Sequence, residues 1–189
     1  MTDIEKIRSG EIKAAVLDIE TTNLKADWGY IVTACLKEVN ADNLKGTTHS
    51  YRSDDYKQHT DERLVRDLVT DMNKYDLILN WYGSRFDIPF INSRSLRHRI
   101  VPPIKNFRRD LCLSARGFGA LTSNRLDNWN RFLFGKTEKT RTDYDIWLRA
   151  TRGQKAAIDY LDHHCKIDVL ETEKLYKEFQ PLLGKLRRA

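Results

Sequence analysis

Two carboxylates, Asp18 and Glu20, stand two residues apart at the end of a short apolar run from Ile12 to Ile19. If this run is a β-strand, side chains at i and i+2 lie on one face, so both carboxylates project together at the strand's end. Two close carboxylates repel each other, and burial makes the repulsion more costly unless cations neutralise them. The pair therefore indicates either a cation-binding edge or two acids that lie in solvent beyond a sheet.

Two further acids lie far along the chain. Asp87 belongs to the polar and aromatic stretch from Asn80 to Pro89, and it also fits the N-cap of a following helix. Asp168 lies within a strongly helical segment, where an acid also fits a solvated helix face. The four acids share a role only if the fold brings their segments together.

The surrounding pattern predicts the elements that would do this. Three strands joined by short connections, at Ile12 to Ile19, Tyr30 to Val39 and Thr47 to Arg52, favour an antiparallel meander. Thr60 fits the N-cap of a helix that carries apolar residues from Leu64 to Met72. The remaining predicted elements are a strand at Asp76 to Leu79, a helix from about Pro89 to Arg97, a possible strand at Phe107 to Leu113, a helix capped by Ser123, and helices at Tyr144 to Ala150 and Ala156 to Phe179.

The charge of the chain is unevenly distributed. Its 33 Lys and Arg against 27 Asp and Glu give +6 overall. Between Ile88 and Thr142, twelve Lys or Arg face only three acids, a local charge of +9 that leaves −3 for the remainder. Clustered basic residues bind polyanions by releasing their counterions, so this segment indicates a phosphate-binding face or, alternatively, a solvated basic surface.

Length and composition set the remaining bounds. A chain of 189 residues with 40% apolar residues suits one globular domain, here residues 1–189. No apolar run reaches the roughly 18 residues of a membrane span, and the polar amino terminus lacks a signal-peptide segment. Three scattered cysteines suggest neither a disulfide framework nor a zinc motif. We expect a reduced, cytoplasmic protein without membrane contacts.

Three segments together resemble the DEDD family of 3′–5′ exonucleases. Val16 to Leu24 resembles the first motif of that family, Asn80 to Ile91 the second and His163 to Asp168 the third, in the expected order. Within this family, the motifs most resemble those of small stand-alone exonucleases that are related to polymerase proofreading domains. The resemblance implies a ribonuclease H-like α/β fold, with a mixed β-sheet of an antiparallel meander plus parallel strands, flanked by helices.

The resemblance also implies a metal site. In it Asp18, Glu20, Asp87 and Asp168 would hold two divalent cations, Mg²⁺ or Mn²⁺. Carboxylate oxygens are the ligands that these hard ions prefer, whereas zinc would favour Cys or more His. Two such ions promote in-line displacement at a phosphodiester, which would release nucleoside 5′-monophosphates from a 3′ end.

The third motif leaves the identity of the water-orienting residue open. The family uses either H-x4-D, which His163 satisfies relative to Asp168, or Y-x3-D, in which His164 takes the tyrosine position. A histidine accepts a proton near pH 7 more readily than a phenol does. The flanking Cys165 and Val169 favour His164.

The other predicted site residues would handle the substrate. Aromatic side chains stack on bases without sequence preference, and basic ones meet phosphates. The candidates are Thr21, Asn80, Trp81, Tyr82, Arg85, Phe86, Arg94, Lys136 and Lys139, with Trp28 as a further stacking candidate.

The sequence is compatible with three functions. The first is a metal-dependent 3′–5′ exonuclease that hydrolyses single-stranded or frayed DNA ends. The second is the same chemistry on RNA, or a structure-selective endonuclease with the same site. The third is a catalytically silent nucleic-acid-binding module. Nucleic acid, DNA in preference to RNA, is the expected partner, and an association with a polymerase or another replication protein has no support in the sequence.

Overall fold

A five-stranded mixed sheet forms the centre of the molecule. The computed structural model describes residues 3–40, 47–50, 53–103 and 106–183. The strand order is β3 (Thr47–Ser50), β2 (Ile31–Glu38), β1 (Ala14–Thr21), β4 (Leu77–Asn80) and β5 (Phe107–Asp110). The first three strands pair antiparallel, whereas β4 and β5 continue the sheet in parallel with β1. This confirms the predicted meander with added parallel strands and the ribonuclease H-like α/β class.

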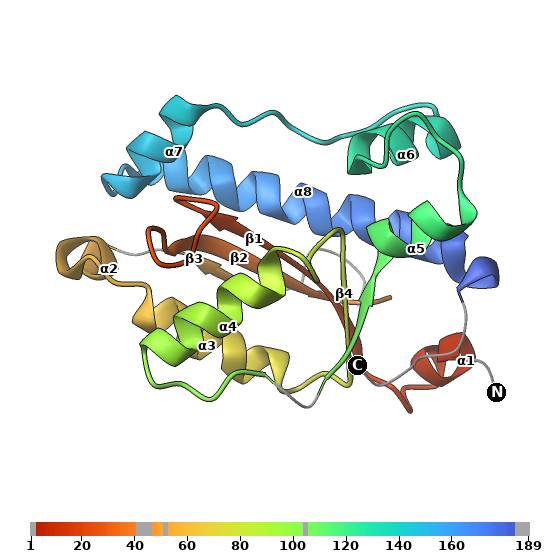
Figure 1. The fold of residues 1–189 in the computed structure, drawn as a ribbon, viewed down its shortest axis with the longest axis horizontal. Helices are drawn as coiled ribbons and strands as arrows, with labels where there is room; N and C mark the ends of the chain where they lie inside the picture. Colours follow the sequence, from red (N-terminus) through yellow and green to blue (C-terminus); the bar gives the residue numbers. More distant parts are fainter. Residues whose placement is uncertain (1–2, 41–46, 51–52, 104–105, 184–189) are drawn as a thin grey trace.

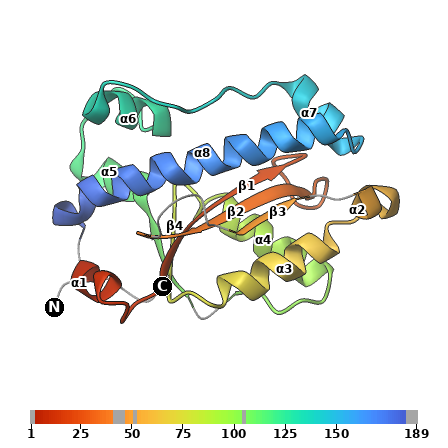
Figure 2. The same ribbon diagram turned by 180° about the vertical axis from the view of Figure 1, so that it is seen from behind.

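Helices cover both faces of this sheet (Figures 1 and 2). The long α8 (Lys155–Phe179) crosses one face, while α3 (Glu62–Met72) and α4 (Asp87–Arg97) lie on the other. The shorter helices are α1 (Asp3–Arg8), α2 (Ser53–Gln58), α5 (Leu111–Phe118), α6 (Leu126–Phe134), α7 (Tyr144–Thr151) and the 3-10 turn η1 (Gln180–Leu182). None of the described helices is both long and apolar enough to cross a membrane.

The alternation of side chains along β1 sets which face receives the acids. Leu17 and Ile19 are buried in the core shared with α3 and α4. Val16 belongs to the opposite core, with Cys165 and Val169 of α8. Asp18 and Glu20 follow Val16 at the same two-residue period, so they lie on the α8 face at the end of β1.

Several predicted boundaries differ from the structure. The strand predicted at Phe107 to Leu113 ends at Asp110, because the Asp110 carboxylate accepts the Leu113 N–H and starts α5. The helix assigned to Thr60 begins at Glu62, after Asp61, whose side chain is bonded to other elements. Ser123 lies two residues before Arg125, the N-cap of α6. The helix expected from Pro89 begins at Asp87, and residues 51–52 of the third predicted strand lie outside the described part.

Candidate active site

Four acids from three separate motifs surround one region between the end of β1 and α8. Asp18 and Glu20 come from β1, Asp87 from the start of α4, and Asp168 from the middle of α8. The charges of Asp168, Glu20 and Asp87 all act on the Asp18 carboxyl group, so the four acids are neighbours in the structure. The Cys165 thiol is 3.2 Å from the Asp18 carbonyl oxygen, so α8 is fixed against β1 at this point. The structure thus brings together the four acids predicted from the motifs.

Asp87 is fixed to β1 through the backbone. Its Oδ1 accepts the N–H of Ile19 at 3.1 Å, and its side chain is buried. Burial raises the pKa of Asp87 to about 7, against the lowering effect of its backbone hydrogen bonds, while Asp110 and Asp168 raise it further. Asp87 therefore retains its proton to near neutral pH unless a cation is bound.

The β1 acids experience the same effect more strongly. Burial raises the pKa of Asp18 well above its usual value, and the neighbouring Asp168, Glu20 and Asp87 raise it further. Burial and Asp168 likewise raise the pKa of Glu20. Asp18 Oδ2 and Asp168 Oδ1 are buried without a hydrogen-bond partner, a rare condition for carboxylate oxygens. A cluster of repelling acids with unpaired oxygens fits hard divalent cations.

Lys139 provides the positive charge in this cluster. Its ammonium group forms an ion pair with Asp168 Oδ2. Burial lowers the pKa of Lys139, but the attraction of Asp168, Asp18 and Glu20 is larger, and the net shift is upward. Within the described residues, no three His, Cys, Asp or Glu side chains are gathered as a formed metal site. The donor set therefore suits divalent ions, but its oxygens must draw together around them.

An extended segment between α6 and α7 places Lys139. Along this segment, residues 136–143, Thr137 donates to Glu171 Oε2 at 2.8 Å, and Thr140 Oγ1 lies 2.5 Å from His164 Nδ1. The Tyr160 hydroxyl donates to the carbonyl of Arg141 at 2.6 Å. Together with Asp168, the partner of Lys139, these residues fall on successive turns of α8, which the segment follows in Figure 1. Side-chain contacts to α8 thus determine the position of a segment that has no regular structure.

The structure separates the two histidines. His164 is buried, and its Nε2 lies 3.4 Å from Glu20 Oε1 and 3.9 Å from Asp168 Oδ2. His163 is exposed. Burial lowers the pKa of His164, Asp168 raises it, and Lys139 and His163 lower it, with a net downward shift. His164 is therefore neutral at pH 7 and adjacent to the acids.

Asp110 holds the loop between β4 and α4, a role that sequence reasoning missed. Its Oδ1 accepts the N–H of Tyr82 at 3.0 Å, and its Oδ2 accepts the N–H and hydroxyl of Ser84 at 3.1 and 2.6 Å. Tyr82 adopts a φ of 67°, unusual for an aromatic residue. At Gly83, an added Cβ would come within 2.5 Å of Asn80, whose Oδ1 accepts the Gly83 N–H. The signal that was available is an acid at the carboxyl end of a strand parallel to β4.

A pocket of about 650 Å³ opens on the acids from the side of α5 and α6. Asp18, Asp168 and Lys139 are among its lining residues. Its lining also includes Tyr82, with the Arg116 guanidinium 5.1 Å from the ring centroid. The remaining lining residues include Trp81, Arg125 and Asp127. The Trp81 indole N–H donates to the carbonyl oxygen of Asn124. Arg116 and Arg125 belong to the predicted basic segment but had no assigned role.

The other predicted substrate residues are more dispersed. Thr21 is buried and donates to the Asn23 carbonyl, while Arg85 and Phe86 line a separate groove beside α4. Arg94 is bonded to the buried Asp61, which gives its charge a structural partner. The Lys136 side chain is 78% exposed, and its ammonium lies 4.0 Å from Glu138. Trp28 is 81% exposed in the connection between β1 and β2.

Comparisons with known proteins agree with this fold. A family model described as RNase_H superfamily matches residues 15–180, most of the chain. No curated protein matches. Among solved structures, the family B DNA polymerase from the hyperthermophilic archaeon Pyrobaculum calidifontis superposes with a TM-score of 0.71 and 16% identity. The match covers 90% of this chain but 25% of the polymerase, so the chain spans about a quarter of that protein's length, and the likeness concerns the fold alone.

Proposed function

The chain belongs to the RNase H superfamily, and on that premise we propose that it is a metal-dependent 3′–5′ exonuclease that hydrolyses single-stranded or frayed DNA ends. The observation that carries the proposal is the convergence of Asp18, Glu20, Asp87 and Asp168, with buried carboxylate oxygens that lack partners. The motif resemblance to proofreading-type exonucleases supports the direction of attack. The structural likeness to a protein whose name is DNA polymerase supports DNA as the substrate.

The four acids would hold two divalent cations, Mg²⁺ or Mn²⁺. Such ions, when bound, activate the attacking water and neutralise charge that develops on the leaving 3′ oxygen. Binding requires all four carboxylates in their ionised form, although burial favours protonation of Asp18, Glu20 and Asp87. Metal binding is therefore coupled to proton release.

His164 is the proposed general base. In the tautomer that donates its Nδ1 proton to Thr140, the Nε2 lone pair lies beside Glu20 and can accept a proton from water. The lowered pKa of His164 keeps the ring neutral, which is the form a base requires. We assign the role to His164 rather than to His163, because the His163 side chain is exposed.

The pocket beside the acids would take the nucleotide nearest the reacting phosphate. Tyr82 offers a partly exposed ring for stacking, and Arg116 lies against that ring. Lys139 lines the same pocket as Asp18 and Asp168, so its charge would favour the anionic transition state at a phosphate bound there. The Asp110 hydrogen bonds keep Tyr82 in its unusual backbone conformation before substrate binds.

The test uses single-stranded DNA and RNA labelled at the 3′ or the 5′ end, with Mg²⁺, Mn²⁺ or EDTA. The proposal expects stepwise shortening of DNA from the 3′ end that stops in EDTA and in Asp18→Ala. Asp159→Ala, a change of an exposed acid on α8, is the matched control and should retain activity. Faster cleavage of RNA would shift the substrate to RNA. Internal cuts would indicate an endonuclease, and metal-independent binding without cleavage would overturn the proposal.

A further inference from the structure

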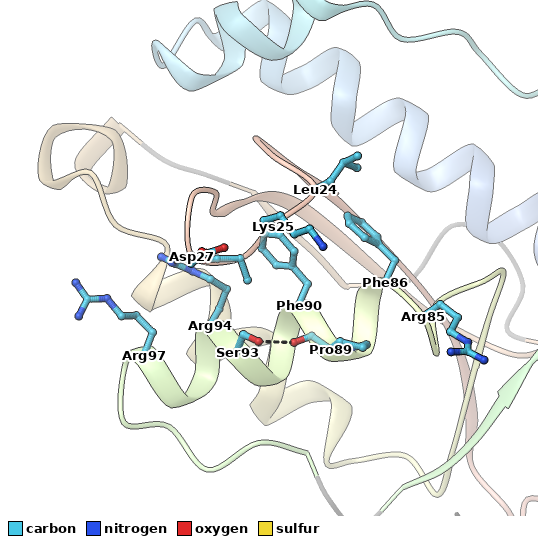
Figure 3. Close-up of a pocket in the computed structure, with 11 residues that line it drawn as sticks. Leu24, Lys25, Asp27, Arg85, Phe86, Pro89, Phe90, Ser93, Arg94 and Arg97 are labelled. Carbon is cyan, nitrogen blue, oxygen red and sulfur yellow. Dashed lines mark hydrogen bonds between the residues drawn. The ribbon is translucent and has the colours of Figure 1, made fainter.

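A second groove begins beside the acids on the α4 side of the molecule. It encloses about 730 Å³, within the usual range of ligand sites, and none of the four acids lines it (Figure 3). One wall is the connection from β1 to β2, including Leu24 and Lys25, and the other is α4 with the residues before it. Phe86 in this wall directly precedes Asp87, so the groove adjoins the candidate active site.

The walls are fixed to each other by a buried ion network. Arg94 of α4 donates to the carbonyl of Ala26 in the opposite wall at 3.1 Å and to Asp61 at 2.7 Å. Asp61 is fully buried, accepts the N–H of Ile31 at 2.9 Å, and lies 2.6 Å from His98 Nε2. The Arg94 charge is thereby neutralised in place. The groove is consequently built into the fold rather than formed by loose surface side chains.

The groove carries exposed basic residues that have no ion pair among the described residues. Lys25, Arg85 and Arg97 line it, and Asp27 is the only acid among the lining residues, all of which the structure describes. In Figure 3, Arg85 and Arg97 extend at opposite ends of the groove. Like charges gathered without partners do not stabilise the fold, so their arrangement favours an anionic ligand.

The basic surface continues past the end of α4. A second hollow of about 540 Å³ shares Arg94 and Arg97 with the groove and adds Arg99 and His59. Its acid, Glu62, is paired with Arg66 at 2.7 Å. Basic residues thus lie before α4 at Arg85, in its last turn at Arg97 and beyond its end at Arg99, and the 11-residue helix is about 16 Å long.

Apolar side chains lie between these charges. Phe86 is partly exposed in the wall of the groove, its ring centroid 5.7 Å from that of the buried Phe90, and the Leu24 side chain is 77% exposed above it. A positively charged groove with aromatic surface is the usual means of holding a single strand without sequence preference. A rigid duplex or an acidic protein does not require this alternation.

We propose that the groove along α4 binds a single-stranded polynucleotide, as a site for the part of the substrate strand that lies beyond the reacting phosphodiester. The proposal rests on the proposed function only in taking the substrate to be nucleic acid. The strand's phosphates meet Lys25, Arg85, Arg97 and Arg99 in turn, and its bases face Leu24 and the accessible part of Phe86. Substrates long enough to reach Arg99 bind more tightly than those that end at the acids.

The test measures binding of fluorescently labelled oligodeoxythymidines of about 4 and about 16 nucleotides by anisotropy in EDTA. The variant is Arg97→Glu/Arg99→Glu. Its matched control is Arg152→Glu/Lys155→Glu, which reverses the same number of exposed charges beside α7, on the other face of the sheet (Figure 1). The proposal expects at least a tenfold loss of affinity for the long oligonucleotide in the α4 variant, with a smaller loss for the short one and in the control.

The salt dependence gives a second readout. Each phosphate contact with a single strand contributes about 0.7 to the magnitude of the slope of log affinity against log salt concentration. Removing two contacts should therefore reduce that magnitude by roughly 1.4. Equal losses in the two double variants, or no preference for the long oligonucleotide, would overturn the α4 site. If Arg97→Glu/Arg99→Glu misfolds by circular dichroism, Arg97→Gln/Arg99→Gln gives the same comparison. The binding measurements in EDTA do not depend on hydrolysis. A failure to cleave DNA in the activity assay would therefore overturn the nuclease proposal and leave the α4 site standing.

Discussion

The imidazole Nε2 of His164 lies 3.4 Å from Oε1 of Glu20, although one residue is on α8 and the other is on β1. Thr140 meets the opposite ring nitrogen at 2.5 Å, so the ring is held between the extended segment and the acids. This relationship places the imidazole that we propose as the general base beside a carboxylate that we propose as a metal ligand. His163, the alternative that the sequence leaves open, is exposed instead.

Replacing His164 by alanine should reduce the rate of hydrolysis by about 10²–10⁴-fold, the usual contribution of a general base. His163→Ala is the matched control, because its side chain is exposed one residue away. Single-turnover rates with Mg²⁺ measure the effect on chemistry rather than on product release. Similar rates for the two variants would remove His164 from the mechanism.

Replacing Lys139 by methionine should tighten the binding of Mn²⁺. In the wild-type protein the ammonium group is paired with Asp168 and is attracted to Asp18 and Glu20, so an incoming cation competes with it. We expect an increase in affinity of about tenfold, the equivalent of about 1.4 kcal/mol. Isothermal titration with Mn²⁺ at constant pH measures it, and Lys136→Met on the same segment is the control. Unchanged or weaker binding in Lys139→Met would show that the lysine does not compete.

The convergence of the four acids could be predicted from the sequence because local patterns determine their positions. The two-residue period of β1 puts Asp18 and Glu20 on one face, and the parallel pairing of β4 with β1 brings the Asp87 loop to the same edge. The helical period does not decide between His163 and His164, because the buried side of α8 depends on how the helix docks. The contact of Cys165 with the Asp18 carbonyl fixes that docking.

Charge alone predicted the basic residues less well. Arg94 looked like a phosphate ligand, but its partner Asp61 is distant in sequence and buried, so only packing identifies the pair. Lys139 lies in a segment without periodicity, whose course follows from the contacts of Thr137 and Thr140 with α8. Asp110 lies within a predicted strand, and the local pattern does not indicate its hydrogen bonds to Tyr82 and Ser84.

Without metal, the protein should become less stable as pH rises from about 4 to about 7. The folded-state pKa of Asp87, about 7, lies above the value near 3.9 of an unfolded chain. The folded state therefore binds this proton more tightly, and the stabilisation is present below about pH 4 and lost as pH rises through about 7. Asp18 and Glu20 shift in the same direction. Urea unfolding in EDTA across this range should show the decline, and Asp87→Asn should reduce its slope. A flat profile would contradict the burial of ionisable acids.

Addition of Mn²⁺ or Mg²⁺ should reverse that loss at neutral pH. A ligand that binds only the folded state stabilises it by about 2.7 kcal/mol at a concentration 100 times its Kd. The measurement is the midpoint of thermal unfolding with EDTA and with increasing metal. Asp18→Asn removes one charge of the cluster and should abolish most of the metal-dependent increase, whereas Asp159→Asn on the exposed face of α8 should retain it. An equal increase in both variants would place the ions elsewhere.

Replacing Asp110 by asparagine should loosen the loop that carries Tyr82. The substitution places an NH₂ group against a backbone N–H that Asp110 now accepts, either that of Tyr82 or that of Ser84. Leaving such a donor unpaired costs about 1–3 kcal/mol. Asp143→Asn is the matched control, because Asp143 also caps a helix, through the Ile146 N–H, but holds no second loop. We expect Asp110→Asn to lower the free energy of unfolding more than the control does and to raise KM for single-stranded DNA. If KM is unchanged while stability falls, Asp110 supports only the helix α5, and the Tyr82 conformation does not serve substrate binding.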